Sequence, residues 1–263
     1  MKDKARIIWP RKYDIFGVNV SATTYDELLG TIIQATKQGI PAIVDHMPVH
    51  GLVTASRDPS LMSKINSFDI VAPDGQPVRW ALNLLHKTTL SDRVCGPEFM
   101  LRLCRRVAEI GIGIYLYGGQ PHVIENLCSN LKRQFPSLQV LGCESPPFRP
   151  LTQEEDKAMV ERINSSGAHI VFLGLGCPLQ EKFAYEHKGK IKAVQICVGA
   201  AFDFHSGAKK MAPKWMQRHA LEWFFRLLQE PQRLSRRYLT TNTIFLFKFF
   251  LELTRVRILS RSR

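Results

Sequence analysis

The sequence predicts an α/β fold: a Rossmann-like parallel sheet with helices on both faces, followed by a C-terminal helical appendage that associates with a membrane. Two observations predict the sheet. Short apolar runs rich in β-branched residues alternate with longer helical patterns, and turn residues follow the runs. The third observation is the charge: residues 207–263 hold 13 Lys and Arg against 3 Asp and Glu, so most of the formal net charge of +13 lies there. We therefore expect an α/β core over residues 1–206 and a basic amphipathic appendage over residues 207–263.

Six apolar runs are the predicted strands of the sheet. They are residues 41–47, 68–75, 113–119, 138–143, 169–176 and 193–201. Helical patterns separate them, over residues 49–66, 97–110, 121–135, 152–166 and 179–187. Ligands of parallel α/β sheets bind beyond the carboxyl ends of the strands. The residues that follow each run are therefore the candidates for a functional site.

Length and composition indicate one substantial core. A chain of 263 residues with 45% apolar content can bury a single core of that kind. The first residues are too charged to form a secretory signal peptide, so we expect the protein on the cytoplasmic side of the membrane. The six cysteines form no CxxC pair, and free buried thiols are the expectation for them.

Two strand-to-helix junctions are rich in glycine. The first contains Gly118 and Gly119, and the second contains Gly174 and Gly176. Glycine lets backbone N–H groups and a helix N-terminus approach a phosphate, so these four residues are candidates for binding a nucleotide-type ligand. Neither junction has the Rossmann GxGxxG or the Walker pattern, and a plain tight turn explains either one taken alone.

Two charged side chains stand at predicted strand and helix ends. Asp74 follows an apolar run and lies between Pro73 and Gly75. A carboxylate at the ligand-binding edge could take a proton from an attacking hydroxyl, although Pro-Asp-Gly is also a favoured turn sequence. Arg93 precedes the helix start at Gly96, where its guanidinium would hold a diphosphate or pair with an acid.

The appendage combines arginines with apolar side chains. Arg226, Arg233 and Arg236 surround a proline, and guanidinium groups suit diphosphates better than lysines do. Residues 240–263 contain an aromatic run followed by more arginines, which is typical of a helix that lies in a lipid interface, whereas for residues 215–228 a core helix is favoured over membrane contact. A spanning helix needs about 20 apolar residues. The runs here are shorter, so we expect the appendage to lie on an anionic membrane surface without crossing the bilayer.

Several motifs in one order resemble a known family. They are PDGxPV, RVxGPEF, LYGG, GLGxPxQE, GAAFDFxxG and LEWxFRLxxEPxRLxRRY. They are similar to those of the WecG/TagA/CpsF glycosyltransferase family of bacterial surface-polysaccharide biosynthesis, from about residue 15 to about residue 245. The resemblance implies inverting transfer of a hexose or N-acetylhexosamine-type sugar. The donor would be a UDP-sugar, and the acceptor a sugar on a polyprenyl diphosphate carrier, in exopolysaccharide, teichoic acid or surface-antigen assembly.

The resemblance also implies roles for individual residues. Asp74 is similar to the proposed general base of the family, and Arg93 and Gln180 are similar to its active-site polar residues. The appendage arginines that close over the substrate phosphates correspond to Arg226, Arg233 and Arg236. The family is thought to need no metal, so we expect no metal and no other cofactor. The enzyme would be peripheral on the inner face of the cell membrane, and the resemblance is compatible with a homo-oligomer.

One segment departs from the family pattern. Family members usually carry a Thr-x-Asn segment near the first strand end, where this chain has VDHMPVH over residues 44–50. In the family this segment shapes the substrate pocket, so His46 is a candidate substrate-binding residue. The departure leaves UDP-glucose, UDP-N-acetylmannosamine and its uronic acid open as donors. Asp45, His46 and His50 also suggest a metal site, but Pro48 between the histidines argues against it.

Two other classes of protein share some of these features. A nucleic-acid-binding α/β protein would fit the sequence pI of about 9.7, but such proteins spread basic residues along a groove, whereas most of this chain is nearly neutral. We therefore expect no nucleic acid partner. A nicotinamide-dependent oxidoreductase would share the alternating sheet. The sequence lacks the glycine fingerprint of that class at its first strand end.

Overall fold

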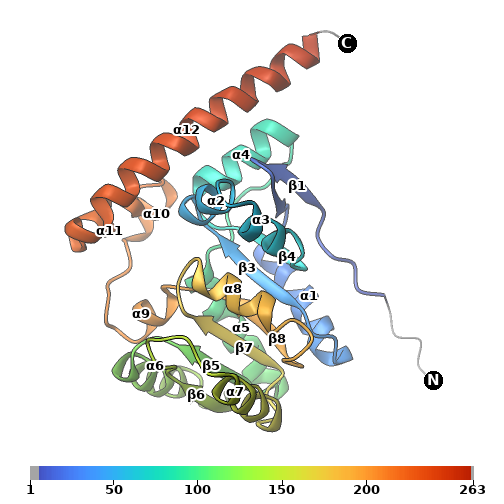
Figure 1. Ribbon diagram of the computed structural model, residues 1–263, viewed down its shortest axis with the longest axis vertical. Helices are drawn as coiled ribbons and strands as arrows, with labels where there is room; N and C mark the ends of the chain where they lie inside the picture. The colour runs from blue at the N-terminus through green and yellow to red at the C-terminus, as the bar shows by residue number, and fades with distance from the viewer. Residues whose placement is uncertain (1–5, 262–263) are drawn as a thin grey trace.

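A six-stranded parallel sheet forms the centre of the molecule, in a computed structural model that describes residues 6–261 (Figure 1). The strands lie in the order β4-β3-β8-β7-β5-β6. Their bounds are β3 (Ile43–Met47), β4 (Ile70–Pro73), β5 (Ile114–Gly118), β6 (Val140–Glu144), β7 (Ile170–Gly174) and β8 (Val194–Cys197). These are the six predicted strands, so the predicted parallel α/β sheet is confirmed.

Helices cover both faces of the sheet. Alternate residues of each strand point to opposite sides, so apolar side chains project from both faces and both have to be covered. On one face, the apolar core includes Ile114 and Leu116 of β5, and on the other it includes Tyr115 and Tyr117. The first face is covered by α1 (Tyr25–Gln38), α5 (Gly96–Ile110), α6 (Pro121–Gln134) and the short α9 (Ala201–His205). The second face is covered by α2 (Val49–Ala55), α3 (Pro59–Asn66), α4 (Gln76–His86), α7 (Gln153–Ser165) and α8 (Leu179–Glu186).

The structure corrects the prediction of one helix over residues 49–66, because the chain forms α2 and α3 there. The break follows from local chemistry. Pro59 occupies the first turn of α3, and the carboxylate of Asp58 caps it by accepting hydrogen bonds from the N–H groups of Ser60 at 3.0 Å and Leu61 at 3.1 Å. A proline with an N-cap before it starts a new helix rather than continuing the old one.

Several elements at the start of the chain were not predicted. An antiparallel hairpin of β1 (Lys12–Ile15) and β2 (Val18–Ser21) packs beside β4, and helices α1 and α4 were also missed. The hairpin strands have four residues each, which is too short for a clear alternation. The hairpin is tied to the sheet by Ser21, whose hydroxyl accepts a hydrogen bond from the N–H of Val71 at 3.0 Å.

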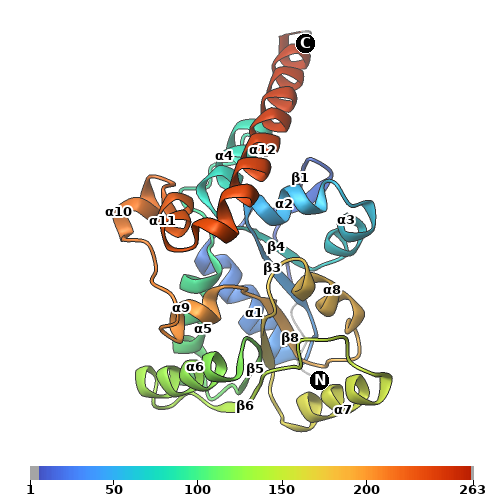
Figure 2. The same cartoon turned by 60° about the vertical axis from the view of Figure 1, so that its left-hand side comes forward.

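The end of the chain forms three helices, α10 (Lys214–Arg218), α11 (Glu222–Gln229) and the long α12 (Pro231–Arg261). Helix α12 packs on α2 and α4 and then continues beyond the core (Figures 1 and 2). Its main anchor is Phe245, which is buried and packs edge-on against Phe16 at 5.5 Å between ring centroids. Lys248 adds a hydrogen bond to the Ser56 hydroxyl at 2.9 Å. The division of the chain at residue 206 stays a prediction.

Within residues 6–261, no helix has both the length and the apolar character needed to cross a bilayer.

Candidate active site

One cavity of about 2120 Å³ lies at the carboxyl ends of the strands, where the residues that follow β3, β4, β5, β7 and β8 meet α11 and α12. It is lined by most of the predicted site residues. They are His46, Asp74, Arg93, Gly119, Gly174, Gly176, Gln180, Arg226 and Arg233. Gly118 and Arg236 are not among the lining residues. The structure therefore brings core residues and appendage residues to a single space.

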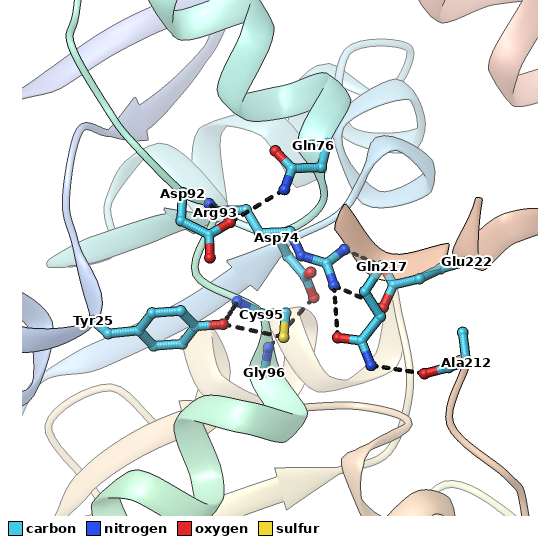
Figure 3. Close-up of polar contacts among 10 residues, drawn as sticks. All are labelled: Tyr25, Asp74, Gln76, Asp92, Arg93, Cys95, Gly96, Ala212, Gln217 and Glu222. Atoms are coloured by element: carbon cyan, nitrogen blue, oxygen red, sulfur yellow. Dashed lines mark hydrogen bonds and ion pairs between the residues drawn. The ribbon is translucent and has the colours of Figure 1, made fainter. Parts of the chain in front are cut away.

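Asp74 follows the last residue of β4 and lines the cavity. Its backbone N–H donates to the carbonyl of Met47 at 3.1 Å, and its Oδ2 accepts a long contact of 3.5 Å from the N–H of Gly96 (Figure 3). Burial raises the pKa of Asp74 to about 6, while the positive charge of Arg93 opposes the rise. At neutral pH most of this carboxyl group is therefore ionised, in a state that can accept a proton.

Arg93 joins the core to the appendage. Its guanidinium is buried and forms two hydrogen bonds with the carboxylate of Glu222 on α11, one of them from Nη2 to Oε1 at 2.7 Å (Figure 3). Nη2 also contacts Oε1 of Gln217 at 3.4 Å. Although burial lowers the pKa of Arg93, the bonds to Glu222 and the charge of Asp74 raise it above its ordinary value. The sequence left two partners open for Arg93, a diphosphate or an acidic side chain, and in the structure Arg93 pairs with the acidic side chain of Glu222.

His46 and Gln180 present neutral acceptor atoms. Nδ1 of His46 lies 3.1 Å from the carbonyl oxygen of Cys197, and a carbonyl can only accept, so the hydrogen is on Nδ1 and Nε2 has a free lone pair. Burial lowers the pKa of His46 to about 4, which keeps the ring neutral. Gln180 donates from Nε2 to Oε1 of Glu181 at 3.1 Å. Within the described residues, Nε2 of His46 and Oε1 of Gln180 are buried without a hydrogen-bond partner.

The glycines at the two junctions have a packing role. Gly118 has a φ of +130°, and a Cβ there would lie 2.6 Å from the backbone of Gly174. A Cβ on Gly174 would in turn lie 2.4 Å from the ring of Phe202. The N–H of Gly119 donates to the carbonyl of Gly174 at 3.1 Å, so this group is engaged within the protein. Phosphate binding by Gly118, Gly119, Gly174 and Gly176 stays a prediction.

Three arginines of the appendage face the cavity, and one of them differs from the predicted set. Arg226 and Arg233 line it as expected, but the third is Arg237, whereas Arg236 is exposed and outside the lining. Within residues 6–261, Nε of Arg237 is buried with no hydrogen-bond partner. Burial lowers the pKa of Arg237, and the charges of Arg226 and Arg233 lower it further. The three guanidinium groups therefore repel one another and would be stabilised by a bound anion.

Arg237 was not among the site residues predicted from the sequence, and His50 was named there only as a metal ligand. Arg237 lies four residues after Arg233, which is the spacing that puts two side chains on one face of a helix. Arg236, at three residues, satisfies the same rule, so the sequence could not choose between them. His50 lines the cavity at the start of α2, and burial together with Arg237 and Arg226 lowers its pKa to about 4.

Two buried carboxyl groups lie behind the cavity lining, of which Glu181 was not predicted and Asp45 was named only as a metal ligand. Asp45 precedes His46 in β3 and Glu181 follows Gln180 in α8, and burial is the main cause that raises the pKa of both. The charge of Glu181 raises the pKa of Asp45 further. As for a metal, the part of the chain over residues 6–261 contains no group of three or more His, Cys, Asp or Glu side chains that could hold one.

Comparison with known protein families gives one match that covers nearly the whole chain. Residues 13–258 match the model of the glycosyl transferase WecG/TagA/CpsF family. The chain therefore belongs to this family, as its motifs indicated. Membership makes it a glycosyltransferase of surface-polysaccharide biosynthesis, with a sugar donor and an acceptor as its substrates.

Proposed function

We propose that this member of the WecG/TagA/CpsF family is an inverting glycosyltransferase. It moves a hexose or N-acetylhexosamine-type sugar from a UDP-sugar to a sugar carried on a polyprenyl diphosphate. The observation that carries the proposal is the composition of one cavity. A carboxylate with a pKa of about 6, three arginines and an apolar end all belong to it.

The carboxylate suits a direct displacement. In this reaction the acceptor hydroxyl attacks the anomeric carbon of the donor sugar, the bond to UDP breaks, and the hydroxyl proton leaves. Asp74 is the proposed general base that takes this proton, a role usually worth about 10²- to 10⁴-fold in rate. A base works best when its pKa lies near the working pH, and burial brings Asp74 toward that range. Attack on the side opposite the leaving group inverts the anomeric centre.

The arginines suit the phosphate groups of the substrates. Arg226, Arg233 and Arg237 bring three positive charges to the cavity, and Arg233 forms an ion pair with Glu230. Guanidinium groups bind phosphate oxygens through paired hydrogen bonds, and such cations stabilise the charge that develops on a departing diphosphate. Their place in the appendage means that the appendage has to rest against the core for the reaction to proceed.

The apolar end of the cavity suits a lipid tail. It is lined by Trp80 and Leu84 of α4 and by Leu246 and Phe249 of α12. Trp80 is 43% exposed and Leu84 is 53% exposed. An isoprenoid chain would remove this surface from water, at about 25 cal/mol for each Å² buried. Further along α12, Phe247 and Phe250 are exposed, and apolar side chains among basic residues are typical of a helix in a lipid interface.

Location and donor choice follow from the same features. The enzyme would act as a peripheral protein on an anionic membrane surface at the cytoplasmic face, held there by the appendage. Neutral acceptors, Nε2 of His46 and Oε1 of Gln180, suit sugar hydroxyl groups. The hydroxyl groups of glucose, of N-acetylmannosamine or of its uronic acid could each donate to these two atoms, so all three UDP-sugars remain candidate donors. Formation of a homo-oligomer stays a prediction.

A transfer assay with defined substrates tests the proposal. Radiolabelled UDP-sugars are offered one at a time with a polyprenyl-diphosphate-linked sugar, and the product is followed in the lipid fraction. We expect one UDP-sugar to give an elongated lipid-linked product with inverted anomeric configuration. In parallel, UDP should raise the melting temperature, whereas NAD and single-stranded DNA should not. Transfer with retained configuration, or stabilisation by NAD or DNA alone, would contradict the proposal.

A further inference from the structure

Two cysteines that the proposed reaction does not use lie in contact. Cys128 is in α6 and Cys143 is in β6, and their Sγ atoms are 2.9 Å apart. In a disulfide the two sulfurs are about 2.05 Å apart, so a movement of less than about 1 Å would join them. Cys143 is exposed, so a reagent in solution can reach it, whereas Cys128 is buried beneath it. The pair therefore has one accessible thiol and one thiol that can resolve a mixed disulfide.

The other four thiols have different surroundings. Cys95 contacts the hydroxyl of Tyr25 at 3.2 Å, and Cys104 is fully buried in the apolar core. Cys177 and Cys197 lie near the buried carboxyl groups, and burial together with Glu181 and Asp45 raises the pKa of both thiols. Of the six cysteines, all within the described residues, Cys143 is the exposed one.

The cysteine pair is connected to the rim of the cavity. Two residues after Cys143, the hydroxyl of Ser145 donates to the carbonyl of Gly119 at 2.7 Å. Gly119 lies just before the start of α6, the helix that carries Cys128. The segment that follows Ser145, residues 146–153, lines the cavity. A covalent link between α6 and β6 would therefore hold together the two elements that carry this part of the rim.

We propose that Cys128 and Cys143 form a reversible intramolecular disulfide. The pair is then a redox modification site, and its oxidation links α6 covalently to β6 beside the cavity. The reduced and oxidised proteins would differ in the freedom of residues 145–151. Substrate access along that rim then depends on the redox state, while Asp74 and Arg93, on other elements, are left unchanged.

The oxidant is a low-molecular-weight disulfide, and the exchange proceeds in two steps. The thiolate of Cys143 attacks one sulfur of the oxidant, which forms a mixed disulfide and releases one thiol. The thiolate of Cys128 then attacks the Cys143 sulfur, which forms the protein disulfide and releases the second thiol. Two protein thiols have lost two electrons and two protons, and the oxidant has been reduced to two thiols. Burial and the contact with Cys128 raise the pKa of Cys143, and Lys132 opposes the rise.

Oxidation by glutathione disulfide, followed by peptide mass spectrometry, tests the thiol pair. The full-length protein is treated in mildly alkaline buffer, free thiols are alkylated, and the digest is analysed without reduction. We expect a peptide pair linked through Cys128 and Cys143 that disappears after dithiothreitol. Cys128→Ser should instead accumulate glutathione on Cys143, and the control Cys104→Ser should form the link as the unaltered protein does. Stable glutathione on Cys143 of the unaltered protein, with no link to Cys128, would overturn the proposal.

Hydrogen exchange tests the connection to the rim. A disulfide that closes a loop of this size should raise the melting temperature of a protein of this length by about 5 to 10 °C. It should also slow amide exchange in residues 145–151, and Cys143→Ser should show neither effect under the same oxidation. If amide exchange at residues 145–151 were equal in the disulfide-linked and the reduced protein, the proposed connection between the cysteine pair and the cavity would be wrong.

Discussion

The two sides of the cavity are held in different ways. On the core side, His46 belongs to β3 and Asp74 follows β4 in the buried sheet, and Gln180 is buried in α8. On the appendage side, α11 has no buried residue, and α12 is attached to the core through the buried Phe245 and the half-buried apolar side chains near it, Ile244, Phe249, Leu253 and Val256. The core side supplies the carboxylate, and the appendage side supplies the positive charge. The appendage is held through α12, whereas α11, which carries Arg226, has no buried side chain of its own.

Arg93 and Glu222 are where these two sides meet. The ion pair is largely buried on the arginine side, with side-chain exposure of 5% for Arg93 and 29% for Glu222. Both partners act on the pKa of Asp74, since Arg93 lowers it and Glu222 raises it. Burial is the main cause that raises the pKa of Asp74, and docking of the appendage adds the smaller effect of the Glu222 charge.

Asp74→Asn should give the largest effect, because it removes the proposed base from the core side. We expect turnover to fall by about 10²- to 10⁴-fold while the melting temperature and the affinity for UDP stay close to those of the unaltered protein. Asp92→Asn is the matched control, because Asp92 lies outside the cavity and accepts a hydrogen bond from Gln76 at 3.1 Å. Steady-state rates and UDP titration calorimetry give both quantities. Turnover of Asp74→Asn equal to that of the control would remove the base assignment.

Phe245→Ala should release the appendage from the core. Phe245 is 5% exposed and Phe250 is 58% exposed, although both lie on α12. Truncating a buried phenylalanine costs about 3 to 5 kcal/mol, whereas a surface change costs about 0.5 kcal/mol or less. We expect Phe245→Ala to lower the melting temperature and Phe250→Ala to leave it unchanged but to weaken sedimentation with anionic vesicles. The same loss of stability in both variants would mean that α12 is not attached through one face.

Arg237→Gln and Arg236→Gln compare two neighbouring arginines of the appendage. Arg237 lines the cavity and Arg236 does not, so the first should bind phosphate groups and the second should not. A hydrogen bond to a charged group is worth about 1.5 to 3 kcal/mol, so we expect Arg237→Gln to weaken UDP binding by about 10- to 100-fold. Arg236→Gln should bind UDP as the unaltered protein does. Isothermal titration calorimetry measures both affinities. A larger loss of UDP affinity in Arg236→Gln than in Arg237→Gln would favour Arg226, Arg233 and Arg236, the arginines expected from the sequence, as the phosphate-binding residues.

The sheet could be predicted from the sequence because its signal is local. Each strand from β3 to β8 is a short apolar run bounded by turn residues, and runs buried on both faces stand out from helices. The hairpin strands were missed because they have only four residues each, whereas α1 was missed although Thr24 caps its start and Gly39 ends it. The split between α2 and α3 could have been read from Asp58 and Pro59, which are an N-cap and a first-turn proline.

The site was predictable only in part. Asp74, His46 and Gln180 were found because a residue that follows a strand, or belongs to a family motif, can be located by position alone. The choice of Arg237 over Arg236 depends on which face of α12 packs on α2, and helical spacing does not fix that face. The pairing of Arg93 with Glu222 joins residues 129 positions apart, and no local pattern in the chain indicates it.

The pH dependence of kcat/KM tests most directly the claim that both sides of the cavity act on one titrating carboxylate. The base works when ionised, so activity should be constant at neutral pH and should fall as the pH drops through about 6. Arg93→Gln removes a charge that lowers the pKa of Asp74, so the fall should occur at higher pH. Glu222→Gln removes a charge that raises it, so the fall should occur at lower pH. A profile without an acid limb, or a shift of both variants in the same direction, would contradict the account.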